Sequence, residues 1–421
     1  MAHDVAVVGA GLAGLCCARE LTARGLDVTL LEASDGVGGR VRTDELDGFL
    51  LDRGFQVLLT AYEEAARVLD YGSLDLRAFT PGACVRVGGR FSQVSDPFRR
   101  PADLLATLAS PVGSLADKAR LGLLRRSVRS GPPQRVWERP ETTTLAELQR
   151  LGFSARMIDR FFRPFLGGVL LDDALGTSSR QFAFVFRAFF EGDSVLPMTG
   201  IAAIPEQLAA GLPEGVVRLG TPVAAVGPAE VAPNGVTLAG GERVAARAVV
   251  VAVDGPGAAR LAGVAAPASR GVLALYFAAD RAPLDEPVLL LDGDHGGPVN
   301  NACVPSSVAP GYAPAGAALV SASVLATDDP GDDARLVPAV RDQLRGWFGP
   351  QVDGWRHLRT YRIAHAQPAQ PPPALTPPER DVRVRPGVYV CGDHRDNASI
   401  NGAMASGRRA AEAVAADLAR V

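Results

Sequence analysis

Three glycines near the start of the chain have the spacing of a nucleotide-binding turn. They follow the apolar run Val5–Val8, which is typical of a strand buried on both faces. The first glycine permits a tight reversal, the second a close approach to a pyrophosphate, and the third close packing of the next helix. Phosphates are favoured at that helix's N-terminus by free amides and the helix dipole. The predicted phosphate-binding residues are Gly9, Gly11, Leu12, Ala13 and Gly14.

An acidic residue follows at the distance that a dinucleotide fold requires. The second predicted strand, Val28–Leu31, ends at Glu32 and Ala33. A carboxylate at this point can accept hydrogen bonds from both ribose hydroxyls of an adenosine, and it repels a 2′-phosphate. The pattern therefore disfavours NADP.

A second glycine cluster distinguishes this chain from a plain NAD dehydrogenase. Gly38 and Gly39 precede Arg40, and together they offer backbone amides and a guanidinium to the same phosphates. Context thus strengthens a glycine motif that would be weak evidence by itself.

The C-terminal end carries a further signature. The predicted strand Val388–Cys391 leads into Gly392 and Asp393, and the segment 398–403 precedes a predicted helix over Met404–Leu418. With the N-terminal motifs, this resembles the superfamily of FAD-dependent amine oxidases, protoporphyrinogen oxidases and carotenoid (phytoene) desaturases. We place the chain nearest its desaturase-like branch.

The resemblance implies the fold and most of the cofactor contacts. It implies an α/β fold in which a Rossmann-type, glutathione-reductase-like FAD-binding domain holds an inserted α+β substrate domain. It places Asp393 on the ribityl chain, the last helix near the flavin O2, a strand and turn beside the isoalloxazine, and one valine on the adenine. A helix N-terminus there stabilises a reduced, anionic flavin. The residues so implied are Gly54, Phe55, Gln56, Val223, Gly392, Asp393, Ile400, Gly402 and Ala403. No cysteine stands where some members attach the flavin covalently, so we expect noncovalent FAD.

Changes in sequence pattern predict the domain division. Residues 1–82, 195–264 and 352–421 are assigned to the FAD-binding domain, and 83–194 and 265–351 to the substrate domain. The first insertion is predicted mostly helical, and the second is predicted to hold strands and one helix. The apolar strand 249–253 and the following Asp254–Gly257 lack the third glycine of a second nucleotide site, so we interpret Asp254–Gly257 as a structural loop. Electrons are then expected to leave to oxygen, a quinone or another acceptor.

Composition excludes several other classes. The chain has 421 residues, 47% of them apolar, and a net charge of −3, which argues against nucleic acid as a partner. Its five cysteines include no Cys-x-x-Cys, which argues against a dithiol reductase, a zinc site or any other metal centre. Cys16 and Cys17 are predicted to be core fillers on the first helix. No signal peptide or membrane-spanning run is recognised, so we expect a cytoplasmic protein.

Three residues are predicted to carry the catalytic chemistry. His365 can titrate near neutral pH and is the predicted proton acceptor, with Gln56 and Tyr361 shaping the site. The predicted strand 271–277 lacks the lysine that family amine oxidases commonly carry. The absence of this lysine weakens the prediction of an amine substrate.

Phenylalanines gather at 161–165 and 182–190, where they form either a core or the wall of an apolar substrate site. The basic stretch Lys118–Arg126 is either a solvated face or a peripheral contact with a membrane. The leading hypothesis is an FAD-dependent oxidoreductase, an oxidase or desaturase that transfers a hydride from an apolar or mixed small molecule to flavin N5. The alternatives are an amine oxidase that releases an imine and hydrogen peroxide, and a flavin-dependent isomerase without net redox. The substrate, the electron acceptor and the oligomeric state cannot be predicted.

Overall fold

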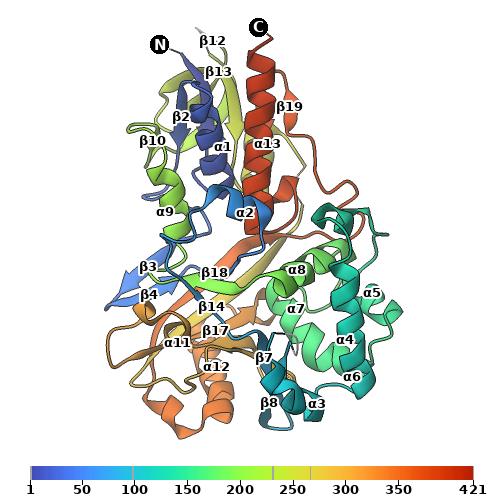
Figure 1. Ribbon diagram of the computed structural model, residues 1–421. Helices are drawn as coiled ribbons and strands as arrows, with labels where there is room; N and C mark the ends of the chain where they lie inside the picture. The colour runs from blue at the N-terminus through green and yellow to red at the C-terminus, as the bar shows by residue number, and fades with distance from the viewer. Residues whose placement is uncertain (1, 97–98, 230–231, 266, 421) are drawn as a thin grey trace.

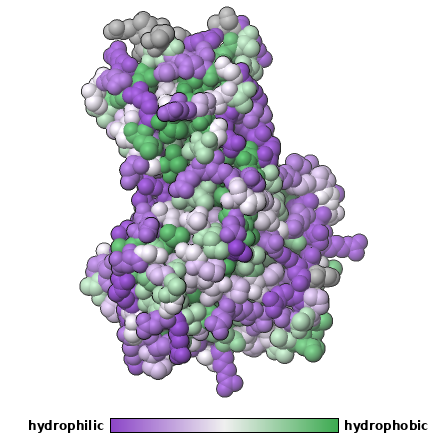
Figure 2. Space-filling model, turned by 60° about the vertical axis from the view of Figure 1, so that its left-hand side comes forward, coloured by the Kyte–Doolittle hydropathy of each residue, from purple (hydrophilic) through white to green (hydrophobic). Residues whose placement is uncertain are grey.

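The computed structural model describes residues 2–96, 99–229, 232–265 and 267–420. A narrow upper part holds both chain termini, and a broader lower part holds the large second sheet and most of the helices (Figure 1). The face shown in Figure 2 is mostly hydrophilic, with smaller apolar areas between. The predicted α/β fold class is confirmed. The upper sheet is parallel at its centre, the lower sheet is mostly antiparallel, and helices pack on both.

The upper sheet is built around the first predicted strand. Strand β1 (His3–Val8) lies between β2 (Val28–Leu31) and β13 (Arg243–Val251), all parallel. Val5 and Val7 pack on one face of the sheet, and Ala6 and Val8 pack on the other. The apolar run is therefore buried on both faces, as predicted. The remaining strands of this sheet are β10 (Val217–Arg218), β11 (Val223–Ala229), β12 (Ala232–Leu238), β19 (Arg383–Arg385) and β20 (Val388–Val390).

Two helices from opposite ends of the chain cover one face of this sheet. Helix α1 (Leu12–Ala23) and helix α13 (Ile400–Leu418) lie side by side (Figure 1). A Cβ atom at Gly407 would lie only 2.2 Å from the carbonyl oxygen of Ala13, so the close contact needs a glycine there. Cys16 and Cys17 are buried in α1, as predicted.

The prediction of a loop at Asp254–Gly257 is wrong. Helix α10 (Gly255–Ala262) starts there, and the side chain of Asp254 caps it by accepting a hydrogen bond from the Gly257 amide. Pro256 is compatible with the first turn of a helix, where its missing N–H has no partner to lose. The Asp-Gly-Pro-Gly run resembles a turn, and this hid the helix start.

The lower sheet has seven strands in the order β18-β14-β17-β16-β15-β7-β8. The predicted hairpin at 84–91 forms its edge as β7 and β8, which join the strands of the second insertion. The long strand β18 pairs with β14 from Ser269 to Ala278, although the predicted boundary at residue 352 put β18 in the FAD-binding domain. The domain division as a whole remains a prediction. The bounds are β7 (Gly82–Val87), β8 (Arg90–Ser95), β14 (Ser269–Ala279), β15 (Leu289–Asp292), β16 (Val299–Cys303), β17 (Ala318–Leu325) and β18 (Arg356–Pro368).

Helices pack on this sheet, and short elements join the two halves. Helix α12 (Asp333–Phe348) buries Leu336, Val340 and Leu344 in one core with apolar residues of β14 and β17. The joining elements are β3 (Thr43–Leu46), β4 (Phe49–Asp52), β5 (Leu58–Leu59), α2 (Glu63–Val68), β6 (Leu76–Ala78), β9 (Ser194–Pro197), α9 (Ala203–Ala210) and α11 (Pro305–Val308).

The first insertion is mostly helical, as its sequence pattern indicates. The phenylalanines of both predicted stripes interlock in one cluster, in which the Phe162 and Phe182 side chains are almost fully buried. This packing identifies them as core. The helices are α3 (Leu104–Ala109), α4 (Leu115–Val128), α5 (Thr144–Arg150), α6 (Ala155–Met157), α7 (Arg163–Leu170) and α8 (Ser179–Glu191).

One buried carboxylate holds the helical insertion together. Asp117 accepts hydrogen bonds from the amide and hydroxyl of Ser114, which caps α4, and from the amide and hydroxyl of Ser154, which caps α6. Burial by itself would raise the pKa of Asp117, but these hydrogen bonds outweigh it and lower the pKa to about 2.

We expect Asp117→Asn to lower the free energy of unfolding by about 2 kcal/mol at neutral pH, because the folded state favours the ionised carboxylate. The folded pKa lies below the unfolded value of 3.8, so this stability is present above about pH 4 and is lost as the pH falls toward 2. Urea unfolding of both proteins between pH 2.5 and 7 measures the difference. The exposed Asp280→Asn is the control, and a difference that does not change with pH would contradict this account.

Candidate cofactor and active site

The glycine turn is closed on one side and open on the other. A Cβ atom at Gly14 would lie 1.9 Å from the carbonyl oxygen of Gly9, so α1 packs on the strand only with glycine at this position. Gly9 has a φ of +101°, in the region that favours glycine. At Gly11, by contrast, the nearest atom to an added Cβ is 4.0 Å away, on Gly38. The turn therefore leaves free space beside Gly11, where a pyrophosphate can approach the backbone.

The Glu32 side chain is hydrogen-bonded to the glycine turn. Its carboxylate accepts hydrogen bonds from the Ala10 amide at 2.7 Å and from the amide of Ser34, the residue after Ala33, at 2.9 Å. The backbone carbonyl of Glu32 accepts from Thr221, two residues before Val223 at the start of β11. The predicted ribose and adenine contacts thus lie on neighbouring strand ends.

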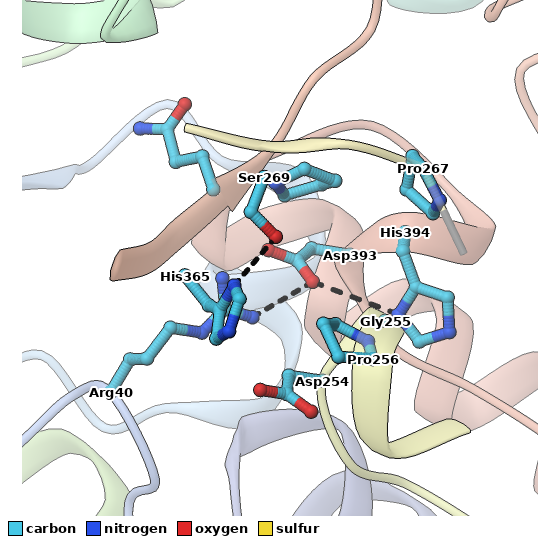
Figure 3. A pocket seen from close by; sticks show the side chains of 11 residues that line it. Arg40, Asp254, Gly255, Pro256, Pro267, Ser269, His365, Asp393 and His394 are labelled. Atoms are coloured by element: carbon cyan, nitrogen blue, oxygen red, sulfur yellow. Dashed lines mark hydrogen bonds and ion pairs between the residues drawn. The ribbon is translucent and has the colours of Figure 1, made fainter. Parts of the chain in front are cut away.

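The second glycine cluster closes over the first. The Gly38 amide donates to the Ala10 carbonyl at 2.8 Å, and Gly38 and Gly39 both have positive φ. From here the Arg40 side chain extends to the C-terminal segment. Its guanidinium donates to the carboxylate of Asp393 at 2.8 Å and to the carbonyl of Ala366 at 2.7 Å (Figure 3).

The Arg40–Asp393 pair is the polar centre of the site. Asp393 follows Gly392, whose φ of +144° again favours glycine, and its side chain is only 9% exposed. Burial alone would raise the pKa of Asp393, but the charge of Arg40 and its hydrogen bond outweigh burial and lower the pKa. The two ends of the chain therefore meet in a charge-assisted hydrogen bond.

The N-terminus of α13 lies directly after this pair. Ser399 caps the helix by accepting from the Gly402 amide at 2.9 Å, and the Ala403 amide donates to the Ser399 carbonyl at 3.0 Å. Within the described part of the chain, the amides of Ile400 and Asn401 have no acceptor. The free donors of this helix are therefore two residues earlier than the predicted pair Gly402 and Ala403, and they include the predicted Ile400.

The predicted flavin-side turn contacts both Arg40 and the lower sheet. The side-chain amide of Gln56 donates to the Arg40 carbonyl at 2.9 Å. A Cβ atom at Gly54 would lie 2.8 Å from the Cδ1 atom of Ile363 on β18, so the turn passes close to this strand. Phe55 packs edge-on against Phe79.

The three predicted catalytic residues do not converge. His365 is exposed, its Nδ1 atom lies 2.8 Å from the Ser269 hydroxyl, and it lines a pocket with Arg40 and Asp393 (Figure 3). Tyr361 points elsewhere and donates its hydroxyl to Asp44 at 2.7 Å. Burial, followed by this hydrogen bond, raises the pKa of Tyr361 to about 12. Tyr361 is therefore a hydrogen-bond donor to a carboxylate at neutral pH.

Asp254 and His394 are the titratable residues of this pocket that the sequence did not predict. Asp254 was assigned to a loop, although it caps α10 beside Arg40. His394 directly follows the predicted Asp393. It lies in a buried turn, and its burial could not be predicted from the sequence.

These features define a dinucleotide-binding fold in which residues from the two ends of the chain meet at one site. The chain belongs to the family described as flavin containing amine oxidoreductase, whose model matches residues 12–415. It is an FAD-dependent oxidoreductase. The recognition made from the glycine motifs and the C-terminal segment is thus confirmed.

Similar proteins include both oxidases and a desaturase. The chain is 29% identical to protoporphyrinogen oxidase 2 of Arabidopsis thaliana over 169 residues, which are 40% of this chain and 33% of that protein. It is 52% identical to hydroxyneurosporene desaturase of Rubrivivax gelatinosus over 52 residues, 12% of this chain and 10% of that one. The matched region thus spans a third or less of these relatives.

Solved structures share the whole fold. Cyclohexylamine oxidase from Brevibacterium oxydans superposes with a TM-score of 0.73 at 19% identity and covers 100% of both chains. At this identity the likeness shows the fold alone. No helix in the described part of this chain is long and apolar enough to cross a membrane.

The contrast between Gly11 and Gly14 predicts two different defects. We expect Gly14→Ala to destabilise the FAD-free protein, because the methyl group collides with the Gly9 carbonyl. We expect Gly11→Ala to leave the melting temperature of the FAD-free protein unchanged and to weaken FAD binding at least tenfold, since the methyl group fills the open side of the turn. Thermal melting and flavin fluorescence titration measure the two effects, and equal FAD affinity in wild type and Gly11→Ala would contradict the assignment.

Proposed function

We propose that this FAD-dependent oxidoreductase oxidises an apolar or mixed, uncharged small molecule, and that FAD is held noncovalently between the two ends of the chain. The Arg40–Asp393 pair is the observation that supports this arrangement, because it joins the second glycine cluster to the C-terminal segment. In the proposal, Gly9–Gly14 and Arg40 face the pyrophosphate, Glu32 the ribose, and Asp393 the ribityl chain. When bound, FAD supplies a hydride acceptor at flavin N5.

The lower sheet offers apolar and aromatic side chains next to the predicted flavin-side turn. Phe55, Tyr276 and Tyr361 belong to one cluster with aliphatic residues of β4 and β14, and the rings of Tyr276 and Tyr361 meet edge to face. Tyr276 is buried in this cluster, whereas Phe55 and Tyr361 are half-buried at its edge. Such an edge suits a substrate that is bound by apolar contact, with a few polar groups to orient it.

The carboxylates of this region already have partners. Asp44 pairs with Arg53 and accepts from Tyr361, and the buried Asp52 accepts from Thr43 and Tyr312. A substrate ammonium would have to displace one of these partners. We therefore favour an uncharged substrate over an amine.

The fold likeness to amine oxidases keeps an amine substrate as the second candidate. An amine oxidase would release an imine and hydrogen peroxide. A flavin-dependent isomerase would instead need reduced flavin and consume no stoichiometric acceptor.

Anaerobic mixing of the FAD-loaded protein with a panel of compounds separates these candidates. We expect polyenes, porphyrinogens or hydroxylated isoprenoids to bleach the flavin absorbance, and we expect amines to leave it unchanged. Reoxidation by oxygen or a quinone then identifies the acceptor. Bleaching by amines alone, with peroxide formed on admission of oxygen, would overturn the substrate class.

We also propose His365 as the proton acceptor, with Gln56 as a positioning residue that holds the Arg40 backbone. With a substrate from this panel, we expect His365→Gln to lower kcat about 100-fold. FAD affinity is measured alongside, because His365 lines the same pocket as Arg40 and Asp393. An unchanged kcat would exclude the role.

A last proposal concerns the surface of the helical insertion. Helices α3 and α4 expose Leu105, Leu115 and Leu123 by 78%, 66% and 68%, and α4 also carries Lys118 and Arg126. Apolar side chains together with cations suit the surface of an anionic bilayer. We propose peripheral contact with such a membrane through this surface.

Cosedimentation with vesicles tests the contact. We expect Leu105→Glu combined with Leu123→Glu to abolish binding to phosphatidylglycerol vesicles, because both changes place an anion at the bilayer. Leu219→Glu is the control, since Leu219 is 45% exposed on the other part of the molecule, after β10. Equal sedimentation of all three proteins would contradict the proposal.

A further inference from the structure

His394 is a buried side chain without a partner. It lies in the short turn Asp393–Arg395, and its side chain is only 1% exposed. Neither ring nitrogen has a hydrogen-bond partner in the described part of the protein. The nearest carboxylate oxygen, on Asp393, is 4.0 Å from Nδ1, which is too far for a hydrogen bond. Buried polar groups are nearly always satisfied, so two orphaned nitrogens in one ring indicate a missing ligand.

The imidazole lines the pocket that contains the Arg40–Asp393 pair. The ring lies beside the start of α10 at Gly255 and Pro256 (Figure 3). The charged groups that face it are Arg40, Asp254, Asp393 and Arg395. The missing ligand therefore lies at the meeting point of the two chain ends, next to the carboxylate that we assign to the ribityl chain.

The protonation state of the His394 ring limits which chemical group can be its hydrogen-bond partner. Burial, only partly offset by Asp393, lowers the pKa of His394 to about 4, so the imidazole is neutral at pH 7. A neutral imidazole has one N–H donor and one acceptor nitrogen. A hydroxyl group is the complementary partner because it can also donate and accept.

We propose that His394 is a cofactor-binding residue that hydrogen-bonds a hydroxyl group of the ribityl chain of FAD. The proposal rests on the assignment of Asp393 to that chain and adds a second protein group to it. His394 acts on binding and not on the reacting atoms. It leaves the FAD-free protein with an unsatisfied polar group, which the cofactor satisfies on binding.

Replacement by phenylalanine separates this role from a structural one. We expect His394→Phe to weaken FAD binding about tenfold. We expect its melting temperature in the FAD-free form to be equal to or higher than that of the wild type, since an unsatisfied buried group is removed. His357→Phe is the matched control, because that half-buried histidine has a partner, the Thr360 hydroxyl at 2.9 Å. It should lower the melting temperature and leave FAD affinity unchanged.

Analogues of the cofactor identify the contact. Wild-type protein should bind at least one of 2′-deoxy-FAD, 3′-deoxy-FAD and 4′-deoxy-FAD about tenfold more weakly than FAD. The His394→Phe variant should not distinguish that analogue from FAD, because the contact is already lost. His394→Leu, which also removes both ring nitrogens, supplies the same comparison if the phenylalanine variant does not fold.

The outcomes are distinct. A His394→Phe variant with unchanged FAD affinity, or an equal loss of affinity for every analogue in both proteins, would overturn the inference. Wild-type protein that binds no FAD would instead overturn the proposed arrangement of the cofactor between the chain ends.

Discussion

The hydrogen-bonded ion pair between Arg40 and Asp393 is the contact on which the arrangement of the site depends. Its two residues are 353 positions apart in the chain, and each follows glycines with positive φ. The carboxylate is almost fully enclosed, so its charge is tolerated only because a guanidinium lies against it. The second glycine cluster reaches Asp393 through Arg40, and the flavin-side turn reaches the Arg40 backbone through Gln56.

Close backbone packing makes that pair possible. The first and last helices approach so nearly that a side chain at Gly407 would collide with Ala13, and α1 reaches the strand through Gly14. Gln56 then ties its own turn to the Arg40 backbone, and Arg40 in turn bonds the Ala366 carbonyl on β18. Strand β18 belongs to the lower sheet, so this contact links the nucleotide-binding part to the sheet proposed to face the substrate.

Local signals made the nucleotide-binding part predictable. The run Val5–Val8 could only be a strand buried on both faces, and Glu32 stood at the expected distance from the glycines. Pairing between strands that are far apart in the sequence was harder to predict. The apolar strand predicted at 249–253 is only the end of the continuous β13, which begins at Arg243, and β16 carries the polar Asn300 and Asn301. A polar strand is recognisable only when the neighbours that bury it are known.

The sequence by itself determined the cofactor class, because spaced glycines, a strand-end acid and a C-terminal Gly-Asp act through local backbone geometry. It also determined that the chain has a large apolar core. Tertiary structure alone decided which polar groups meet: Tyr361 turned to Asp44, His365 joined Arg40 and Asp393, and His394 was buried without a partner. Side-chain partners come from distant segments, and their hydrogen bonds depend on packing that no single segment encodes.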